Sequence, residues 1–231
     1  MLGKKTFLCA VVFIILSYSL WAGDSAVFSD LGFSPDGKNY MFAQYGVQSG
    51  TLKPWADLFV VDVANNSFVN GGRISFVHDA AVSAGNDGTG ALYRVIARNS
   101  ALADEYRIDF MSPGQPLYIA VNGSAAAPNE SIEFRDFSTG NSYKANLVSY
   151  SEGSGQDLKS SFFINLESSS PAGNRSLTVG NPQIKRPLIE EYRIKKVVKA
   201  PLGGSIIFVI EMKKQAASGY DIRYMVETVK L

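Results

Sequence analysis

The chain has 231 residues, a formal net charge of +1, and 46% hydrophobic against 19% charged residues. This balance supplies enough apolar mass for one domain or two small ones, and the near-zero net charge argues against nucleic acid as a partner. Aromatic residues make up 12% of the chain, which favours strands because flat rings pack well on a pleated sheet.

Residues 1–23 are predicted to form a secretory signal peptide. Lys4 and Lys5 precede an apolar run from Phe7 to Leu20, and small residues follow before the first acidic one. A membrane anchor is the alternative interpretation. However, about 14 apolar residues fall short of the roughly 20 that a helix needs to span a bilayer.

Cleavage is expected after Ala22 or Gly23, which leaves a single mainly β domain over residues 24–231. The one cysteine, Cys9, leaves with the signal, so we expect no disulfide and no thiol chemistry. Without the two N-terminal lysines, 20 basic residues face 21 acidic ones, a net charge of −1. The mature protein is expected in the periplasm or outside the cell, without stable membrane insertion.

The first part of this domain predicts a β-meander. In the segment Leu31–Lys38, Pro35 fixes the first turn position and Gly37 permits a positive φ, so a hairpin is expected. Asp57–Val63 is predicted to be the next strand, and Asn65–Asn66 the turn after it.

One amphipathic helix is predicted between Gly88 and Glu105, where apolar residues recur at helical spacing. Asp87 is the expected N-cap, and Asn99 interrupts the apolar stripe. The Pro/Gly-rich segment Met111–Pro116 is predicted to be a loop.

Strand patterning resumes over residues 131–167, where apolar and polar residues alternate. The polar stretches Glu152–Asp157 and Ser168–Asn174, rich in Gly and Ser, are predicted to be loops.

The C-terminal part repeats the arrangement of the first meander. Val198–Gly204 carries a Pro-x-Gly turn, and the strands Ser205–Glu211 and Tyr220–Val229 follow it. This similarity indicates either a degenerate internal repeat or two unrelated hairpins with the same turn chemistry. The sequence thus predicts a mainly β (α+β) fold: antiparallel β-meanders forming a sandwich, barrel or propeller-like assembly with one amphipathic helix. The two meanders are expected to lie in, or to close, the same β-assembly.

Two resemblances follow from these motifs. The turn Phe33–Lys38, followed by the strand Val60–Val63, resembles the blades of periplasmic β-propellers of the TolB type. The whole chain resembles a family of bacterial predicted secreted proteins of unknown function. The segments that show this resemblance are Phe33–Gly37, Gln44–Gly46, Leu58–Val63, the central helix and Ile222–Thr228. The resemblance implies export and brings no catalytic residues with it.

The residue types present exclude several kinds of catalytic site. With His78 as the only histidine and no cysteine in the mature part, His/Cys metal clusters and Cys–His nucleophiles are absent. Ala81–Gly85 loosely resembles a nucleophile elbow, but an α/β-hydrolase needs its histidine after the serine, and His78 precedes it. His78 is therefore expected to be a strand-end residue. Asn86–Gly88 lacks the alternating acidic ligands of a calcium loop. We predict no catalytic residues, no metal site and no cofactor.

Paired carboxylates remain as candidates for a hydrolase acting on envelope or extracellular glycans. The pairs are Glu190 with Glu191, Asp57 with Asp62, and Asp221 with Glu227. On alternating strands, such residues are expected to face solvent.

Two further features leave a binding function open. Lys185–Lys199 carries six basic and two acidic residues. This stretch would contact an anionic polymer or lipid headgroups, or it would form a solvated strand whose lysines discourage edge pairing. Trp55, with Tyr45 upstream, would stack on a sugar or anchor a partner if exposed, and would close a loop onto the sheet if buried. We therefore expect an exported envelope protein that is a non-enzymatic binding or structural module, with an envelope protein or polymer as partner. Its binding residues do not follow from the sequence.

Overall fold

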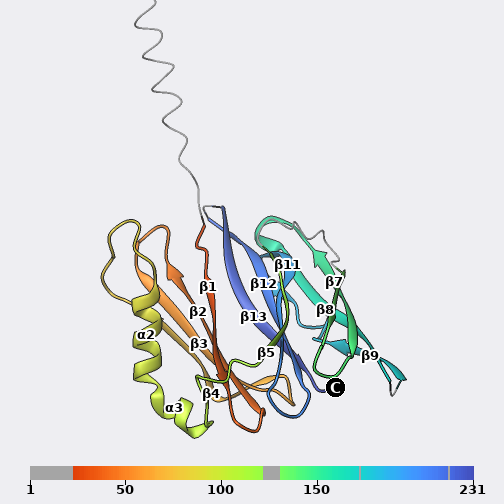
Figure 1. Ribbon diagram of the computed structural model, residues 1–231. Coiled ribbons are helices and arrows are strands. Elements are labelled where there is room, and N and C mark those ends of the chain that lie inside the picture. Colours follow the sequence, from red (N-terminus) through yellow and green to blue (C-terminus); the bar gives the residue numbers. More distant parts are fainter. Residues whose placement is uncertain (1–22, 122–130, 172, 218) are drawn as a thin grey trace, which may run out of the picture.

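The computed structural model describes residues 23–121, 131–171, 173–217 and 219–231 (Figure 1). The predicted signal peptide, apart from Gly23, lies outside the described residues. No helix in these ranges is long and apolar enough to cross a membrane.

The described strands form three antiparallel sheets. The first sheet has the order β1 (Val27–Phe33), β2 (Asn39–Val47), β3 (Pro54–Asp62) and β4 (Ser67–Val77). The middle sheet has the order β13 (Gly219–Val229), β12 (Ile206–Ala216), β11 (Ile189–Lys199) and β5 (Gln115–Ile119). The outer sheet has the order β10 (Arg186–Pro187), β8 (Lys159–Ser170), β7 (Ser142–Glu152) and β6 (Ser131–Arg135), and β9 (Gly173–Val179) also pairs with β8.

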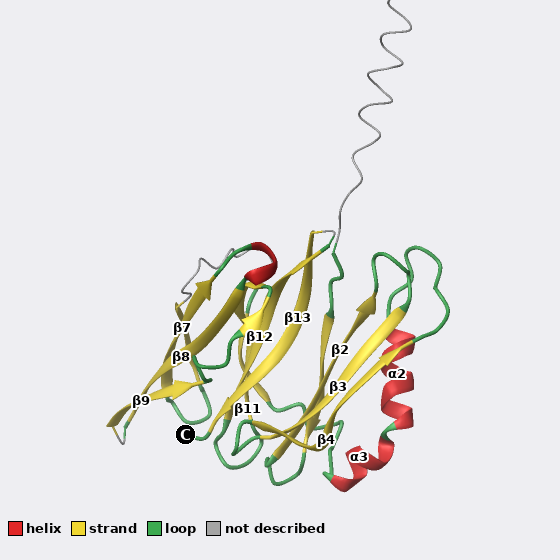
Figure 2. Ribbon diagram, turned by 180° about the vertical axis from the view of Figure 1, so that it is seen from behind, coloured by secondary structure: helices red, strands yellow, loops and turns green. Residues whose placement is uncertain are grey.

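These sheets are stacked face to face, with a helical layer on one side (Figures 1 and 2). Helices α2 (Thr89–Arg98) and α3 (Ser100–Glu105) cover the first sheet, and a short 3-10 turn, η1 (Gly155–Asp157), precedes β8. The predicted mainly β fold of antiparallel meanders is confirmed as a sandwich. The propeller resemblance is not confirmed, because a closed ring needs about four or more blades and the described strands form three sheets.

The longest fully buried apolar segment lies in the middle sheet, which is covered on both faces. Residues Ile206 to Ile210 of β12 have no solvent-exposed surface. Ile206, Phe208 and Ile210 pack against the outer sheet, whereas Ile207 and Val209 pack against the first sheet. Because successive side chains on a strand point to opposite faces, a strand covered on both faces needs apolar residues at every position.

The helical layer differs from the single predicted helix. Ala91, Leu92 and Val95 bury one face of α2 against the first sheet, as the periodicity predicts. The helix breaks at Asn99, whose side-chain amide donates to the Val95 carbonyl oxygen at 2.7 Å. This side-chain bond competes with continuation of the helix, so α3 is a separate element. The N-cap residue is Gly88 rather than Asp87, although the Asp87 carboxylate accepts a hydrogen bond from the Thr89 amide at 3.0 Å.

The two Pro-x-Gly turns both connect antiparallel strands, β1 to β2 and β11 to β12. They also lie against each other, since a Cβ atom on Gly37 would come within 2.6 Å of the Leu202 carbonyl oxygen. The two meanders occupy two packed sheets rather than one sheet. They share a hydrophobic core, and an isolated parallel bridge joins Ser25 to Ile222.

Candidate functional site

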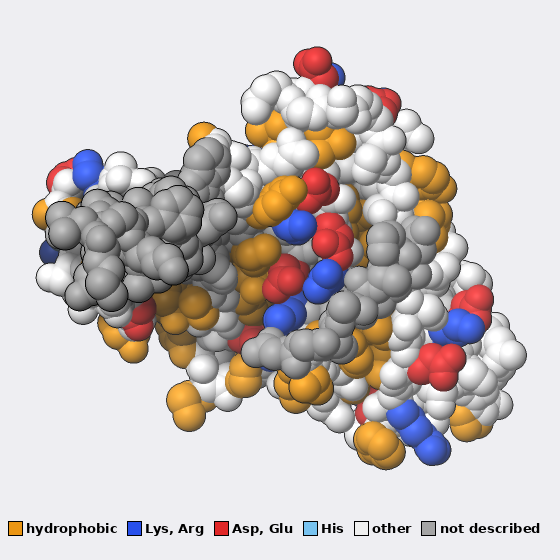
Figure 3. All heavy atoms as spheres, turned by 90° about the horizontal axis from the view of Figure 1, so that it is seen from above, with side chains coloured by type: hydrophobic (Ala, Val, Ile, Leu, Met, Phe, Trp, Pro, Cys, Tyr) orange, Lys and Arg blue, Asp and Glu red, His pale blue; other side chains and the backbone are white. Residues whose placement is uncertain are grey.

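The basic stretch forms ion pairs within the protein. Its strand β11 lies between β12 and β5, so the interpretation as a protective edge strand is wrong. On the face seen from above, Figure 3 shows acidic and basic side chains interspersed rather than a patch of one sign. Each of the six basic residues pairs with a carboxylate: Lys185 with Glu152, Arg186 with Glu227, Arg193 with Glu191, Lys195 with Glu211, Lys196 with Asp30, and Lys199 with Asp136. An anion-binding role for this stretch therefore loses its support.

Two of these pairs join neighbouring layers. Lys196 reaches Asp30 on the first sheet, and Lys199 reaches Asp136 at the turn between β6 and β7 of the outer sheet. Asp136 is fully buried and also accepts hydrogen bonds from Ser138 and Thr139. Burial alone would raise the pKa of Asp136, but the hydrogen bonds from Lys199, Ser138 and Thr139 outweigh it and hold the pKa well below its ordinary value.

The candidate carboxylate pairs do not form an acid and base couple. Asp221 and Glu227 lie six residues apart on β13, a separation of about 20 Å along a strand, whereas a glycosidase pair needs about 5–10 Å. Asp57 and Asp62 are about 17 Å apart on the same grounds. Glu190 and Glu191 lie at a β-bulge of β11, and each forms its own ion pair, Glu190 with Lys213 and Glu191 with Arg193.

Each of these carboxylates has a structural partner instead. Asp62 caps the turn after β3 by accepting hydrogen bonds from the Ala64 and Asn65 amides, both at 3.0 Å. Asp57 accepts from the Gln44 side chain at 3.1 Å. The remaining partners are Lys213 for Glu190, Arg193 for Glu191, Arg223 for Asp221, and Asn66 and Arg186 for Glu227.

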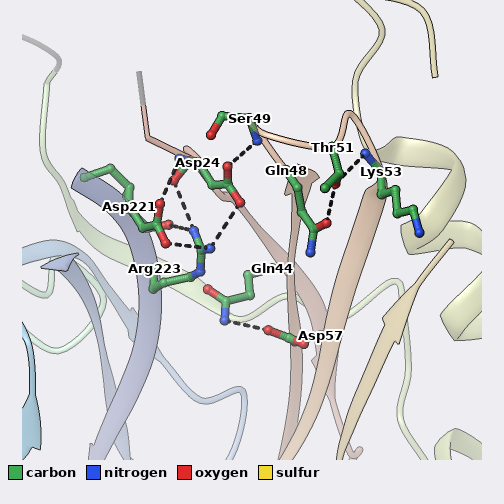
Figure 4. A network of polar contacts seen from close by, with 10 residues as sticks. Asp24, Gln44, Gln48, Ser49, Thr51, Lys53, Asp57, Asp221 and Arg223 are labelled. Atoms are coloured by element: carbon green, nitrogen blue, oxygen red, sulfur yellow. Dashed lines mark hydrogen bonds and ion pairs between the residues drawn. The ribbon is translucent and has the colours of Figure 1, made fainter. Parts of the chain in front are cut away.

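Trp55 is buried, as the second of the two sequence interpretations predicts. Its side chain belongs to the core between the first and middle sheets, and the Arg223 guanidinium lies 4.5 Å from the ring centroid. Arg223 belongs to a polar cluster at this end of the sheets (Figure 4). With 6% of its surface exposed, Trp55 presents no ring face to a sugar or a partner.

The region around His78 is a loop without a catalytic arrangement. His78 directly follows β4, in agreement with a strand-end position, and its backbone amide donates to the Pro54 carbonyl at 2.8 Å. Ala81–Gly85 lies in the loop before α2 rather than in a strand–turn–helix elbow. Among the described residues, no group of three or more His, Cys, Asp or Glu side chains is placed to hold a metal.

The outward face of the outer sheet is the best candidate site. The inward face of this sheet packs on the middle sheet, and no described helix or sheet covers the outward one (Figure 2). An open groove of about 810 Å³ runs across β6, β7, β8 and β9. A second hollow of about 330 Å³, lined by five residues that include Lys144, Asn146 and Asn165, adjoins it. The groove residues are Glu133, Phe134, Arg135, Ser142, Tyr143, Lys144, Glu167, Ser168, Ser169, Asn174, Arg175 and Ser176.

Strand register places matching polar side chains directly opposite each other on this face. Ser142 faces Ser169, Lys144 faces Glu167, and Asn146 faces Asn165. Side chains at such positions are about 5 Å apart at Cβ, so each pair can contact the same ligand group.

An aromatic pair continues the same face toward the other end of β7 and β8. The rings of Tyr150 and Phe163 are stacked, with centroids 6.1 Å apart. Tyr150 is 55% exposed. The outward face thus combines paired hydroxyl and amide groups with one accessible ring.

The charged groups of the groove alternate across the strands. Glu133 pairs in register with Lys144, which in turn faces Glu167, and the Lys144 ammonium lies 3.9 Å from the Glu133 carboxylate. The two carboxylates are two strand spacings apart, about 10 Å, and both are exposed. Lys144 lies between the two carboxylates, so charges of opposite sign alternate across neighbouring strands of the groove.

The sequence did not identify this face. The predicted loop Ser168–Asn174 is wrong over most of its length, because β8 continues to Ser170 and β9 begins at Gly173. Serine and asparagine are typical loop residues, so a strand whose outward positions carry them is predicted as a loop. The inward alternation Phe162, Ile164, Leu166 was the signal for it.

Comparison with known proteins identifies a family but no characterised relative. No curated protein and no solved structure matches the chain. The family model for "Predicted secreted protein (DUF2259)" matches residues 41–230, which include all three sheets from β2 onward. The chain therefore belongs to the DUF2259 family of predicted secreted proteins.

Proposed function

We propose that this protein is an exported, non-enzymatic binding module that holds a polysaccharide on the outward face of its outer sheet. The observation that carries the proposal is the groove over β6–β9, which no described helix or sheet covers, with its facing polar side chains and the exposed Tyr150 ring beyond it.

The chemistry of a sugar matches both parts of this face. Sugar rings carry hydroxyl groups on their edges, and serine, asparagine and lysine side chains can donate to or accept from them. Their C–H faces are apolar and stack on aromatic rings, whose amphipathic character suits a half-wet site. The pairs Ser142–Ser169 and Asn146–Asn165 would contact hydroxyls, and Tyr150 would contact a ring face.

The composition of the groove favours a glycan over a protein partner. Protein interfaces have an apolar centre surrounded by a polar rim, whereas the outward side chains here are mostly serine, asparagine and charged residues. Three cations, Arg135, Lys144 and Arg175, stand against two carboxylates, Glu133 and Glu167, so the groove carries a net charge of only +1. A neutral or weakly charged polysaccharide is the ligand that fits it.

Binding to insoluble polysaccharide tests the proposal. Purified mature protein would be mixed with peptidoglycan sacculi and with insoluble α- and β-glucans, and the fraction left in solution measured. We expect saturable binding to at least one of them, weakened about threefold to tenfold by Tyr150→Ala, because one stacked ring contributes about 0.5–1.5 kcal/mol. Tyr93→Ala is the matched control, since Tyr93 is 68% exposed on α2 on the opposite side of the molecule.

Three outcomes would overturn the proposal. Equal binding by wild type and Tyr150→Ala, or no binding to any polysaccharide, would remove the role of this face. Release of soluble sugar that stops in Glu167→Gln would instead establish a carboxylate-dependent hydrolase.

A further inference from the structure

Residues 24–26, which follow the predicted signal peptide, are hydrogen-bonded to β13 of the middle sheet. The Asp24 amide donates to Asp221 Oδ1 at 2.9 Å, and the Asp24 carbonyl accepts from the Ile222 amide at 2.8 Å. Two residues on, the Ala26 amide donates to the Ile222 carbonyl at 3.1 Å. Residues 24–26 thus pair with β13 in a short parallel bridge.

The side chain of Asp24 takes part in the same cluster (Figure 4). One carboxylate oxygen accepts from the Ser49 amide, and the other lies 3.5 Å from the Arg223 guanidinium. Arg223 also binds Asp221, at 3.1 Å. All three charged side chains are mostly buried, with 22% or less of each exposed.

The charges of this cluster do not balance. Asp24 and Asp221 contribute two carboxylates, and the contacts described for them include one cation, Arg223. An uncompensated negative charge in a partly buried position is unfavourable. The backbone nitrogen of Asp24 already lies at hydrogen-bond distance from the Asp221 carboxylate.

Position 23, directly before Asp24, accommodates only a small residue, and it is occupied by Gly23. A Cβ atom there would lie 1.8 Å from the Tyr220 carbonyl oxygen, so glycine is the residue that fits against β13. Peptidases that remove signal peptides favour small residues at the first and third positions before the bond they cut. Gly23 supplies the small residue directly before the bond, and Trp21 stands at the third position.

We propose that the signal peptide is removed between Gly23 and Asp24, and that the new α-ammonium group of Asp24 pairs with the Asp221 carboxylate. Hydrolysis breaks the C–N bond between Gly23 and Asp24 and consumes one water. Gly23 leaves as a carboxylate on the signal peptide, and the Asp24 amine takes up a proton at neutral pH. The amide hydrogen bond of the precursor becomes an ion pair, and the cluster then holds two negative and two positive charges. Removal of the leader would thus complete the contact that ties the first and middle sheets together.

The first test is the mass of the N-terminal peptide of protein exported from a bacterial host that expresses the full precursor. We expect a peptide that begins at Asp24. A peptide that begins at Gly23, or at any other residue, would overturn the proposal.

The second test compares the thermal unfolding of two chains, one beginning at Asp24 and one at Gly23, each released from a fusion by cleavage directly before its first residue. The chain beginning at Asp24 is expected to unfold about 3 °C higher, the shift that an ion pair of ordinary strength gives in a domain of this size. Asp221→Asn should remove that difference, whereas Glu133→Gln, which alters an exposed carboxylate on β6 of the outer sheet, should preserve it. Equal midpoints for the two chains would contradict the ammonium–carboxylate pair.

Discussion

Replacement of Asp136 by asparagine should loosen the contact between the outer and middle sheets. Asp136 is fully buried and bonds the side chains of Ser138, Thr139 and Lys199, so it joins the β6–β7 turn to β11. Asparagine keeps the shape of the side chain but removes the charge, which leaves the Lys199 ammonium without its carboxylate.

The size of the effect follows from the burial of the pair. Removal of one partner of a buried ion pair costs about 3–5 kcal/mol, and the Lys199 side chain, being 18% exposed, can recover part of its hydration. We therefore expect a loss of about 3 kcal/mol in the free energy of unfolding. With an m value of about 2 kcal/mol per molar urea, the unfolding midpoint should fall by about 1.5 M.

Urea unfolding of the mature protein at several pH values measures this. Because the folded pKa of Asp136 lies below its unfolded value, its contribution is present above about pH 4 and is lost as the pH falls through the folded pKa. The difference between wild type and Asp136→Asn should thus shrink on acidification below pH 4. Lys199→Met and the double variant complete a cycle that isolates the pair. A midpoint shift below about 0.3 M at pH 7 would refute the reasoning.

Two other substitutions test single residues of the fold. Gly37→Ala should destabilise the protein by about 2 kcal/mol, because Gly37 has a φ of +71° and a Cβ atom there would meet the Leu202 carbonyl. Gly50→Ala is the control, since Gly50 has open space around it and its replacement should change the urea midpoint little. Equal effects of the two substitutions would contradict the close approach of the two turns. Burial raises the pKa of Glu227 in spite of its contacts with Asn66 and Arg186, so the folded state binds more protons and stability should fall as the pH rises above the unfolded carboxyl value of about 4.3. Glu227→Gln should flatten that decline in urea midpoints measured from pH 4 to 7, and an unchanged slope would contradict it.

Local sequence patterns predicted the elements that are determined by neighbouring residues. The hairpin around Pro35 and Gly37, the strand near Asp57–Val63 and the amphipathic face of α2 depend on turn chemistry and periodicity, and each is present. The position of the helix break at Asn99 was visible as an interruption of the apolar stripe, but its consequence depends on a side-chain bond that periodicity does not describe.

Long-range contacts determined what the sequence could not predict. Strand β5 starts in a segment that has the composition of a loop, and its pairing with β11, more than 70 residues away, gives it strand geometry. The cations of the basic stretch resemble a polyanion-binding surface until their partners are known, and Asp30 is 166 residues from Lys196. The candidate groove also depends on long-range contacts, because only the cross-strand register brings its lining residues together on one face.

Chemical-shift mapping is the most direct test of the binding face. Soluble oligosaccharides derived from whichever polysaccharide retains the protein would be titrated into isotope-labelled mature protein while backbone amide signals are followed. The binding face predicts shifts concentrated in β7, β8 and β9, around Asn146, Asn165 and Tyr150, with the α2 signals unmoved. Shifts centred on the helices or on the first sheet, with β7–β9 unaffected, would contradict it.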